Sequence, residues 1–470
     1  MSELKKAIGP WSMIALGTAG VIGSMWLYLG SKFFAAFGAG GTILGMALGT
    51  LLAFCVAKAY SELASRFPRA GGEIVYAYVA GGSTLSFIVG WLLIGAYGGM
   101  VAFYVAAAGE LLTTVFPGLE TIPLYTVGGE TVYAPILAIG VTLTLLILVL
   151  NWFGISIGAI VQLVLFVVML GLGIVVSVVG FGAGHIENLV PAFDPNLQEV
   201  ASPPLAVIAF LLPAFAFLSG FGVVAVLAEE VNAPAKLLGK IVGWSVLLAG
   251  GFYVVVLTAT AFVIPWRETA ALKNGTIEAF EVAGFPTIAL MAFLIGVLGI
   301  ITTFIAVFAA SSRLMLALAR VKLLPPFFGK VHEETRVPRN ALLSTTAIGL
   351  GLGWLGPGAL TWLLNVGGVY IGVVWAITVW CFYRVRKTHR DVEPPYKVRF
   401  AWVPAFGALA ALIVILGGLI PGLPLSLKWP FEYLIFIGWV LLGFLLYWFS
   451  PRTGSKEEHL NSLLGDNTAH

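Results

Sequence analysis

The sequence predicts an all-α membrane protein that crosses the bilayer twelve times. Hydrophobic residues make up 60% of its 470 residues, charged residues only 10%, and the mean hydropathy is +1.01. A soluble domain has about 25% charged residues, so this composition indicates a polytopic membrane protein. The apolar residues gather in runs of about 20, the length that an α-helix needs to span hydrocarbon. The predicted spans cover residues 11–38, 41–64, 84–117, 132–150, 153–182, 203–229, 241–265, 286–319, 339–356, 359–383, 401–422 and 431–450.

The positive charges indicate how these spans are oriented. Cytoplasmic loops of membrane proteins are enriched in Lys and Arg. If the N-terminus is inside, all but four of the 25 Lys and Arg residues fall in cytoplasmic loops, tails or adjoining helix ends. The four exceptions are Lys32, Arg267, Lys273 and Lys428. We therefore expect a multi-pass protein of the plasma membrane with both termini in the cytoplasm.

The first span contains two glycines near its middle, in the stretch Ala19-Gly20-Val21-Ile22-Gly23-Ser24-Met25-Trp26. Glycine has a low helix propensity, and broken backbone at this depth is tolerated only where it is buried in protein or lines a watery cavity. An outer half-helix beginning near Gly23 would present free N–H groups and the positive end of its dipole, which suit a carboxylate. The alternative is that the glycines only allow two spans to pack closely.

Three later stretches carry further motifs. Residues 58–73 contain Ser-Glu-Leu, then Phe-Pro, then Gly-Gly-Glu; residues 215–234 contain Leu-Ser-Gly-Phe-Gly and end in Glu-Glu-Val-Asn-Ala-Pro. Residues 309–340 run from Ala-Ala-Ser-Ser-Arg through Leu-Leu-Pro-Pro to Val-Pro-Arg-Asn. Together with the glycine-broken first span, these motifs resemble the amino acid–polyamine–organocation transporters, in the same order and spacing, over about residues 10–400.

The resemblance implies two five-helix repeats of inverted topology, with the first helix of each repeat broken at the binding site. Residues 11–182 would form the first repeat and residues 203–383 the second, which is inverted because each repeat has an odd number of spans. Transporters of this design bind substrate between the repeats, near the bilayer midplane. Residues 400–450 would form helices 11 and 12, which pack laterally or make a homodimer contact, and residues 451–470 a cytoplasmic tail.

The resemblance also implies an amino acid as substrate. Its carboxylate would bind the N–H groups of Gly23, Ser24 and Met25, and its ammonium the carbonyls near Ala19, Gly20 and Leu218. The residues expected at this site are Ala19, Gly20, Ile22, Gly23, Ser24, Met25, Tyr97, Phe217, Leu218, Ser219 and Gly220. Tyr97, like Tyr104 in the same span, either contributes to the pocket or only packs. Two positions depart from the family: Met25 replaces a third glycine, and Gly222 replaces a frequent acidic residue.

The charged residues narrow the substrate further. All five histidines lie in predicted loops or tails, and every Asp and Glu lies in a loop, a tail or near the end of a span. A polyamine would need buried carboxylates, whereas backbone groups can hold a zwitterion, so we expect a neutral amino acid. The census also offers no metal cluster or catalytic group at depth, which disfavours an embedded enzyme. We expect no cofactor and no nucleic-acid partner. The alternative function is a membrane receptor, which would be favoured if the protein bound its ligand without transporting it.

The mode of energy coupling is left open by the sequence. Adjacent Ser311 and Ser312 on the eighth span either form a sodium site with carbonyls of the broken first span or bond to their own or a neighbouring helix. Lys32 either snorkels to the outer headgroups or attracts anions, and Glu110 is either a solvated end residue or a proton carrier. Proton-coupled relatives often carry a lysine where this chain has apolar residues 167–169. We expect proton-dependent or ion-independent transport, with exchange and sodium symport as alternatives.

Overall fold

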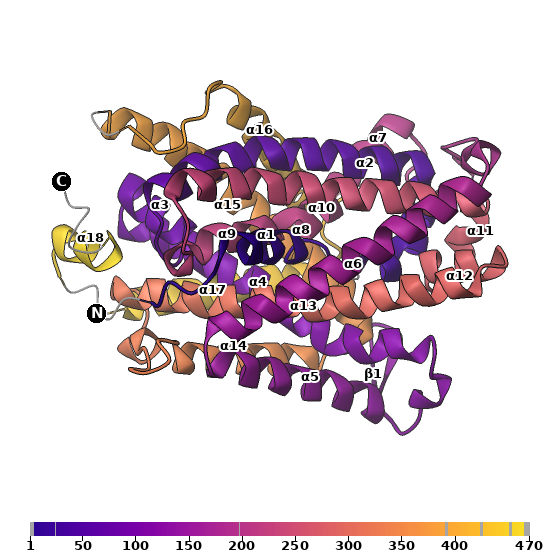
Figure 1. Cartoon of the computed structure of the whole chain (residues 1–470), viewed down its shortest axis with the longest axis horizontal. Helices are drawn as coiled ribbons and strands as arrows, with labels where there is room; N and C mark the ends of the chain where they lie inside the picture. Colours follow the sequence, from indigo (N-terminus) through magenta and orange to yellow (C-terminus); the bar gives the residue numbers. More distant parts are fainter. Residues whose placement is uncertain are drawn as a thin grey trace.

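Long α-helices lie side by side and run roughly along the long axis of the molecule (Figure 1). The computed structural model describes residues 4–23, 25–196, 198–390, 393–423, 426–450 and 454–464. Its α-helices are α1 (Pro10–Ala19), α2 (Met25–Arg66), α3 (Glu73–Gly81), α4 (Ser83–Thr113), α5 (Ala134–Trp152), α6 (Ile155–Ala183), α7 (Pro203–Ala209), α8 (Leu211–Leu218), α9 (Gly222–Val226), α10 (Ala235–Val263), α11 (Trp266–Ala271), α12 (Gly275–Val282), α13 (Pro286–Arg320), α14 (Arg339–Gly353), α15 (Leu360–Thr388), α16 (Val403–Leu419), α17 (Phe431–Phe449) and α18 (Lys456–Leu464).

Within the described residues, nine helices are long and apolar enough to cross a membrane. Twelve spans were expected, and three are missing from this count for identifiable reasons. The outer part of the first predicted span continues into the second within α2, whose merged length is 42 residues. The ninth and eleventh predicted spans form α14 and α16, which are only 15 and 17 residues long. The chain is a polytopic helical membrane protein, as predicted.

Gly38 marks the boundary between the first two predicted spans inside α2. Its φ of +70° and ψ of 172° interrupt the helical backbone at this one residue. An added Cβ at this position would lie 2.4 Å from Oε1 of Gln198, so the site lacks both the conformation and the space for a larger residue. The chain therefore reverses at Gly38, between predicted spans 11–38 and 41–64.

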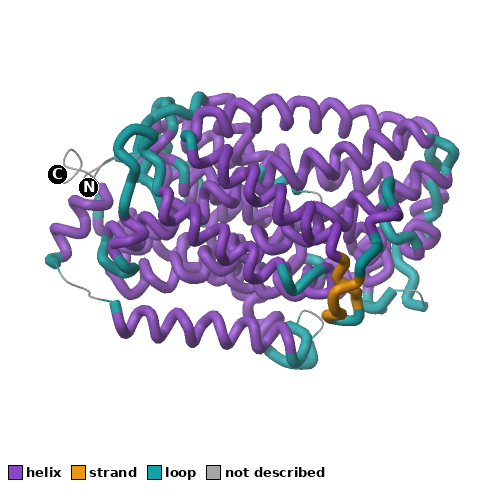
Figure 2. The backbone as a smooth tube through the Cα atoms, turned by 90° about the horizontal axis from the view of Figure 1, so that it is seen from below, coloured by secondary structure: helices purple, strands orange, loops and turns teal. Residues whose placement is uncertain are grey.

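A β-hairpin and several short helices cover the end of the bundle opposite the two termini (Figure 2). Strands β1 (Pro123–Val127) and β2 (Glu130–Tyr133) pair antiparallel, and Gly128 and Gly129 between them have φ of +60° and +85°. Positive φ at both central residues is the requirement of a type I′ hairpin turn. The 3₁₀ helices of the chain are η1 (Pro117–Leu119), η2 (Ile186–Leu189), η3 (Ser219–Phe221), η4 (Ala228–Glu230), η5 (Pro326–Gly329) and η6 (Pro357–Ala359).

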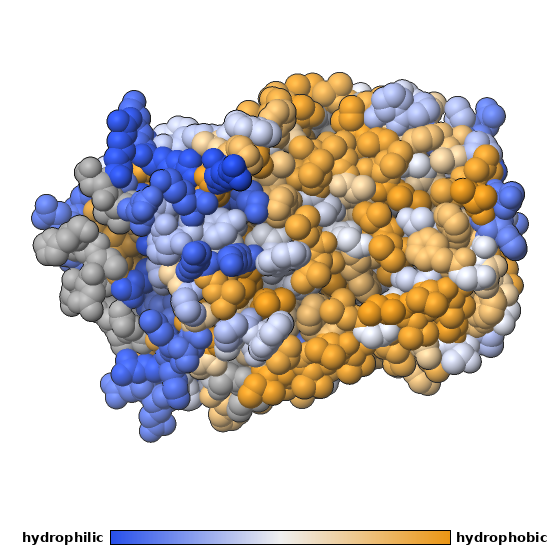
Figure 3. Space-filling view, turned by 45° about the horizontal axis from the view of Figure 1, so that its top comes forward, coloured by the Kyte–Doolittle hydropathy of each residue, from blue (hydrophilic) through white to orange (hydrophobic). Residues whose placement is uncertain are grey.

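The other end of the molecule gathers the polar surface. Figure 3 shows hydrophilic residues concentrated there, and an orange, hydrophobic surface over the middle of the bundle. Helix α18 docks at this polar end, where Tyr78 of α3 and His459 hydrogen bond at 2.8 Å and Lys322 pairs with Glu458 at 3.0 Å. The exposed aromatic residues of α17, such as Trp448 and Phe449, continue the apolar band. This distribution suits a bundle whose middle faces lipid.

Candidate functional site

The first span breaks at the predicted glycines, between the end of α1 at Ala19 and the start of α2 at Met25. Side chains from two distant helices hold the exposed backbone groups. Tyr253 of α10 donates its hydroxyl to the Val21 carbonyl and accepts the Gly23 N–H at 3.0 Å. Thr303 of α13 donates to the Ala19 carbonyl at 2.8 Å. The break is therefore a real feature of the fold, buried among α1, α10 and α13.

The predicted second interruption does not unwind as the first does. At Leu218–Gly222 the backbone stays right-handed: α8 passes into the 3₁₀ turn η3, and α9 begins at Gly222. The α-helix of the sixth span is therefore interrupted by a 3₁₀ turn and not by extended backbone, and the two spans touch at this turn. A Cβ on Gly220 would lie 2.0 Å from the Gly20 carbonyl oxygen, so only glycine fits. The backbone of the first span is thus broken, and the sixth span packs closely against it through Gly220.

The residues expected to bind a carboxylate are only partly described. Ser24 lies outside the described residues, and so does the side chain of Met25, whose backbone begins α2. Gly23 is buried, and its N–H already bonds to Tyr253. Ile22 is fully buried, and its N–H bonds to the Thr18 carbonyl at 2.9 Å. In this structure the described N–H groups at the break are therefore bound to protein groups.

Aromatic side chains surround the meeting point of the two spans. Phe217 lies 5.7 Å from the ring of Tyr253 and 5.6 Å from that of Phe33. Leu218 is buried, and Ser219 donates its hydroxyl back to the Ala216 carbonyl at 2.8 Å, so this hydroxyl contacts its own helix. Phe217 therefore lies beside the break, whereas the Ser219 hydroxyl bonds only within its own helix.

Tyr97 and Tyr104 of α4 are both fully buried, and neither hydroxyl has a hydrogen-bond partner. The Tyr104 hydroxyl would lie 2.4 Å from a Cβ placed on Gly23, and the Tyr97 hydroxyl 2.9 Å from a Cβ placed on Gly222. Buried hydroxyls are normally bonded, so two without a partner call for an explanation. Each tyrosine thus points at a glycine of a different span: Tyr104 at the first and Tyr97 at the sixth.

A family comparison supplies the biological context of this arrangement. The profile of a family described as amino acid permease matches residues 8–442. The chain belongs to the amino acid permease family. It is 27% identical to the branched-chain amino acid permease BcaP of Bacillus subtilis over 97% of this chain and 95% of that protein. It is 26% identical to the methylthioribose transporter of the same organism, over 96% and 95%, and 24% identical to its glutamate/serine transporter AimA, over 96% and 82%. Amino acid transport is the activity of this family.

The predicted ion-site serines of the permease lie apart from the break. Ser312 donates to the Ala309 carbonyl at 2.7 Å and accepts from Arg313 at 3.0 Å, and Ser311 accepts from Thr345 at 3.4 Å. The hydroxyl that contacts the broken helix belongs instead to Thr303, more than two turns earlier on α13. A guanidinium beside Ser312 repels a cation, so the structure gives the sodium hypothesis no support at this pair.

Lys32 and Glu110 lie away from the break, toward the end opposite the termini. Lys32 is exposed. Glu110 lies 3.6 Å from the ammonium of Lys273, which also contacts Glu120 at 3.2 Å. Glu110 is thus the largely buried partner of a loop lysine at the end of its span.

The polar end of the permease contains carboxylates whose burial the sequence did not reveal. Three of them form ion pairs: Glu229 with Arg320 at 2.7 Å, Glu230 with Arg313 at 2.9 Å, and Glu62 with Arg386 at 2.5 Å. Glu73 is only 1% exposed, and one of its carboxyl oxygens has no hydrogen-bond partner. These four acidic residues do lie in loops or near span ends of the sequence, as expected. The sequence did not indicate that their side chains are buried.

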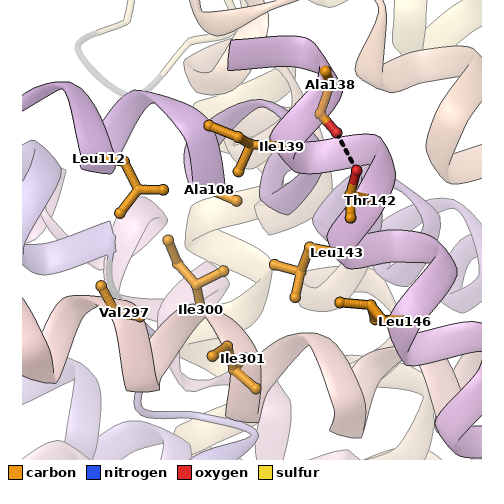
Figure 4. Close-up of a pocket in the computed structure, with 10 residues that line it drawn as sticks. All are labelled: Ala108, Leu112, Ala138, Ile139, Thr142, Leu143, Leu146, Val297, Ile300 and Ile301. Atoms are coloured by element: carbon orange, nitrogen blue, oxygen red, sulfur yellow. Dashed lines mark hydrogen bonds between the residues drawn. The ribbon is translucent and has the colours of Figure 1, made fainter. Parts of the chain in front are cut away.

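A cavity of about 390 Å³ lies elsewhere, between α4, α5 and α13 (Figure 4). Its lining is apolar apart from Thr142, whose hydroxyl bonds back to the Ala138 carbonyl at 2.7 Å. None of the predicted substrate residues lines it, and an apolar cavity cannot pair the charges of a zwitterion. The cavity is therefore no candidate for the amino acid site.

Proposed function

We propose that this permease moves neutral amino acids across the plasma membrane by alternating access. The observation that carries the proposal is the buried contact between the broken first span and the η3 turn, at Gly20 and Gly220, in a chain of the amino acid permease family. Interrupted spans that meet in the bundle leave backbone N–H and carbonyl groups for the two charges of a zwitterion. Substrate binding at this contact requires a movement that opens it.

In this proposal the amino acid carboxylate takes the N–H groups of Gly23, Ser24 and Met25, and its ammonium takes the carbonyls near Ala19, Gly20 and Leu218. The hydroxyl of Tyr253 must then release the Gly23 N–H, which it accepts at 3.0 Å in this structure. Tyr253 thus caps the backbone of the break. Phe217, which packs on Tyr253, would move with it.

The proposal includes the twelve-span arrangement as two inverted repeats, residues 11–182 and 203–383, followed by helices 11 and 12 and a tail at 451–470. The excess of Lys and Arg in the loops and tails expected on the inner side supports cytoplasmic termini. The exposed apolar residues of α16 and α17 suit either lipid or a homodimer contact.

A transport assay on purified protein in liposomes tests the function. We expect uptake or exchange of neutral amino acids, with leucine, isoleucine and valine as the first probes because one relative is a branched-chain permease. Pre-set pH and sodium gradients separate proton-dependent, sodium-dependent and ion-independent modes. Competition by putrescine or spermidine, with none by neutral amino acids, would refute the neutral substrate class.

Gly23→Val tests the site itself. A Cβ at Gly23 would lie 2.4 Å from the Tyr104 hydroxyl, and a β-branched residue resists the backbone of the turn. We expect this variant to fold but to lose amino acid binding, measured by scintillation proximity. The matched control is Gly171→Val in α6, where a Cβ meets nothing within 4 Å, and it should bind like the parent. Full binding by the Gly23 variant would show that the carboxylate site lies elsewhere.

A further inference from the structure

Glu73 is a buried acid that the proposed binding of substrate does not use. It is the first residue of α3, directly after the Gly71-Gly72 turn, and 1% of its surface is exposed. Its side-chain hydrogen-bond partner is Tyr60 of α2, and its second carboxyl oxygen has none. Within the described part of the chain, no ion pair joins it to Lys, Arg or His. A buried carboxyl without a cation costs far less as the neutral acid than as the anion.

The carboxyl points at the start of the inner half of the sixth span. A Cβ on Gly222, the first residue of α9, would lie 2.8 Å from Oε1 of Glu73 and 2.9 Å from the Tyr97 hydroxyl. The carboxyl of Glu73 thus fills the space that a side chain at Gly222 would enter. Two residues earlier, Gly220 lies against the Gly20 carbonyl. A rigid shift of η3 and α9 therefore changes the substrate site and the surroundings of Glu73 together.

The turn that bears Glu73 is docked on α9 by backbone contacts. The Gly71 N–H donates to the Val226 carbonyl at 3.0 Å, and a Cβ on Gly72 would lie 2.7 Å from the Ala225 carbonyl carbon. If the turn and α9 separate, these contacts break and water reaches the carboxyl. The environment that keeps Glu73 neutral is therefore a property of one conformation.

The other charged groups near Glu73 have partners of their own. Tyrosines approach it from α2, α3 and α4, and the charged residues of the neighbouring elements are in ion pairs or hydrogen bonds of their own. These groups are Tyr60, Tyr76 and Tyr97; Glu229 with Arg320; Glu230 with Arg313; Glu62 with Arg386; and His459 with Tyr78. Burial, with no cation to oppose it, raises the pKa of the Glu73 carboxyl to about 8.

We propose that Glu73 carries the proton that this permease couples to amino acid transport. The carboxyl takes up one proton from the outer side and holds it while the Gly71-Gly72 turn is docked on α9. When the two separate and water enters, the proton leaves to the cytoplasm and the carboxylate remains. The proton-bound acid thus favours the docked state, and the anion favours the undocked state. The proposal rests on the proposed amino acid transport and on cytoplasmic termini, and it adds the residue that carries the coupled ion.

The test compares Glu73→Gln, which resembles the neutral acid but cannot titrate, with the parent in liposomes. We expect the variant to retain amino acid counterflow, which needs no net proton movement, and to lose accumulation driven by an inward proton gradient. Glu73→Asp, which still titrates, should keep gradient-driven accumulation with an altered pH profile. The matched control is Glu110→Gln, which removes the other candidate proton carrier and should accumulate amino acid like the parent. Gradient-driven accumulation by Glu73→Gln, or a parent that ignores the gradient, would overturn the proposal.

A second readout does not depend on transport. In pH-difference infrared spectra of the purified protein, we expect the carbonyl band of a protonated carboxyl to titrate near pH 8 in the parent and in Glu110→Gln. The band should be missing from Glu73→Gln. An unchanged band in that variant would show that Glu73 holds no such proton. A parent that moves no amino acid would refute the proposed function and the coupling with it, whereas the infrared band would still report the protonation of Glu73.

Discussion

Two buried glutamates flank the Gly71-Gly72 turn, and they differ in whether an arginine reaches them. Glu229 in η4 is 4% exposed, contacts Arg320 at 2.7 Å and accepts the Ala70 N–H at 3.0 Å. Burial opposes its charged form, but the hydrogen bonds and charge of Arg320, together with backbone N–H groups, outweigh burial and lower its pKa to about 2. Glu73 is equally buried with tyrosine neighbours, and its pKa rises to about 8.

The difference shows that burial alone does not decide what an acidic residue does. With the guanidinium of Arg320 in contact, the Glu229 carboxylate stays ionised and holds η4 against α13. Without a cation in contact, the buried carboxyl is neutral, and in our proposal its charge depends on whether the turn is docked. One glutamate is therefore a fixed structural anion, and the other changes its charge with conformation.

The largest effect should follow removal of the arginine. Arg320→Ala leaves Glu229 buried without its cation, so we expect the free energy of unfolding to fall by about 3–5 kcal/mol. Denaturant unfolding in detergent measures this loss. The control is Lys322→Ala two residues later, whose pair with Glu458 is exposed and should contribute about 1 kcal/mol or less. Equal losses in the two variants would contradict the fixed-anion account of Glu229.

A smaller effect should follow distortion of the turn between the two glutamates. Gly72→Ala places a Cβ 2.7 Å from the backbone of Ala225, at a residue whose φ is +38°. The control Gly82→Ala has a comparable backbone constraint, with φ of +81°, but its Cβ meets nothing within 4 Å. We expect Gly72→Ala to be less stable than the control by about 1–3 kcal/mol, the usual range for overpacking. Equal thermal stability of the two variants would mean that the turn is not docked on α9.

The sequence predicted the spans well because hydropathy is a local property. It did not predict the short helices α14 and α16 or the hairpin β1–β2, because these depend on loop packing. The glycines at residues 20 and 23 were identified correctly, since glycine is informative wherever a span breaks.

The side chains that hydrogen bond to the broken backbone could not be predicted from the sequence. Tyr253 and Thr303 lie more than 200 residues from the atoms they bind, and only packing sets which face of α10 or α13 turns toward α1. For the same reason we named Ser311 and Ser312 as the hydroxyls beside the broken first span, whereas Thr303 is the residue that bonds to the Ala19 carbonyl. Glu73 stood in a recognised motif, but a loop position gives no sign of burial.

The most direct test of the contrast between the two glutamates is the pH dependence of stability in the parent and in Glu73→Gln. Because the folded pKa of Glu73 is raised, its contribution to stability is complete below the ordinary value of 4.5 and is lost as the pH rises to about 8. Relative to Glu73→Gln, the parent should lose on the order of 1 kcal/mol of unfolding free energy per pH unit across this range. Parallel profiles for the two proteins would contradict the account, because they would mean that Glu73 is ionised in the folded state as Glu229 is.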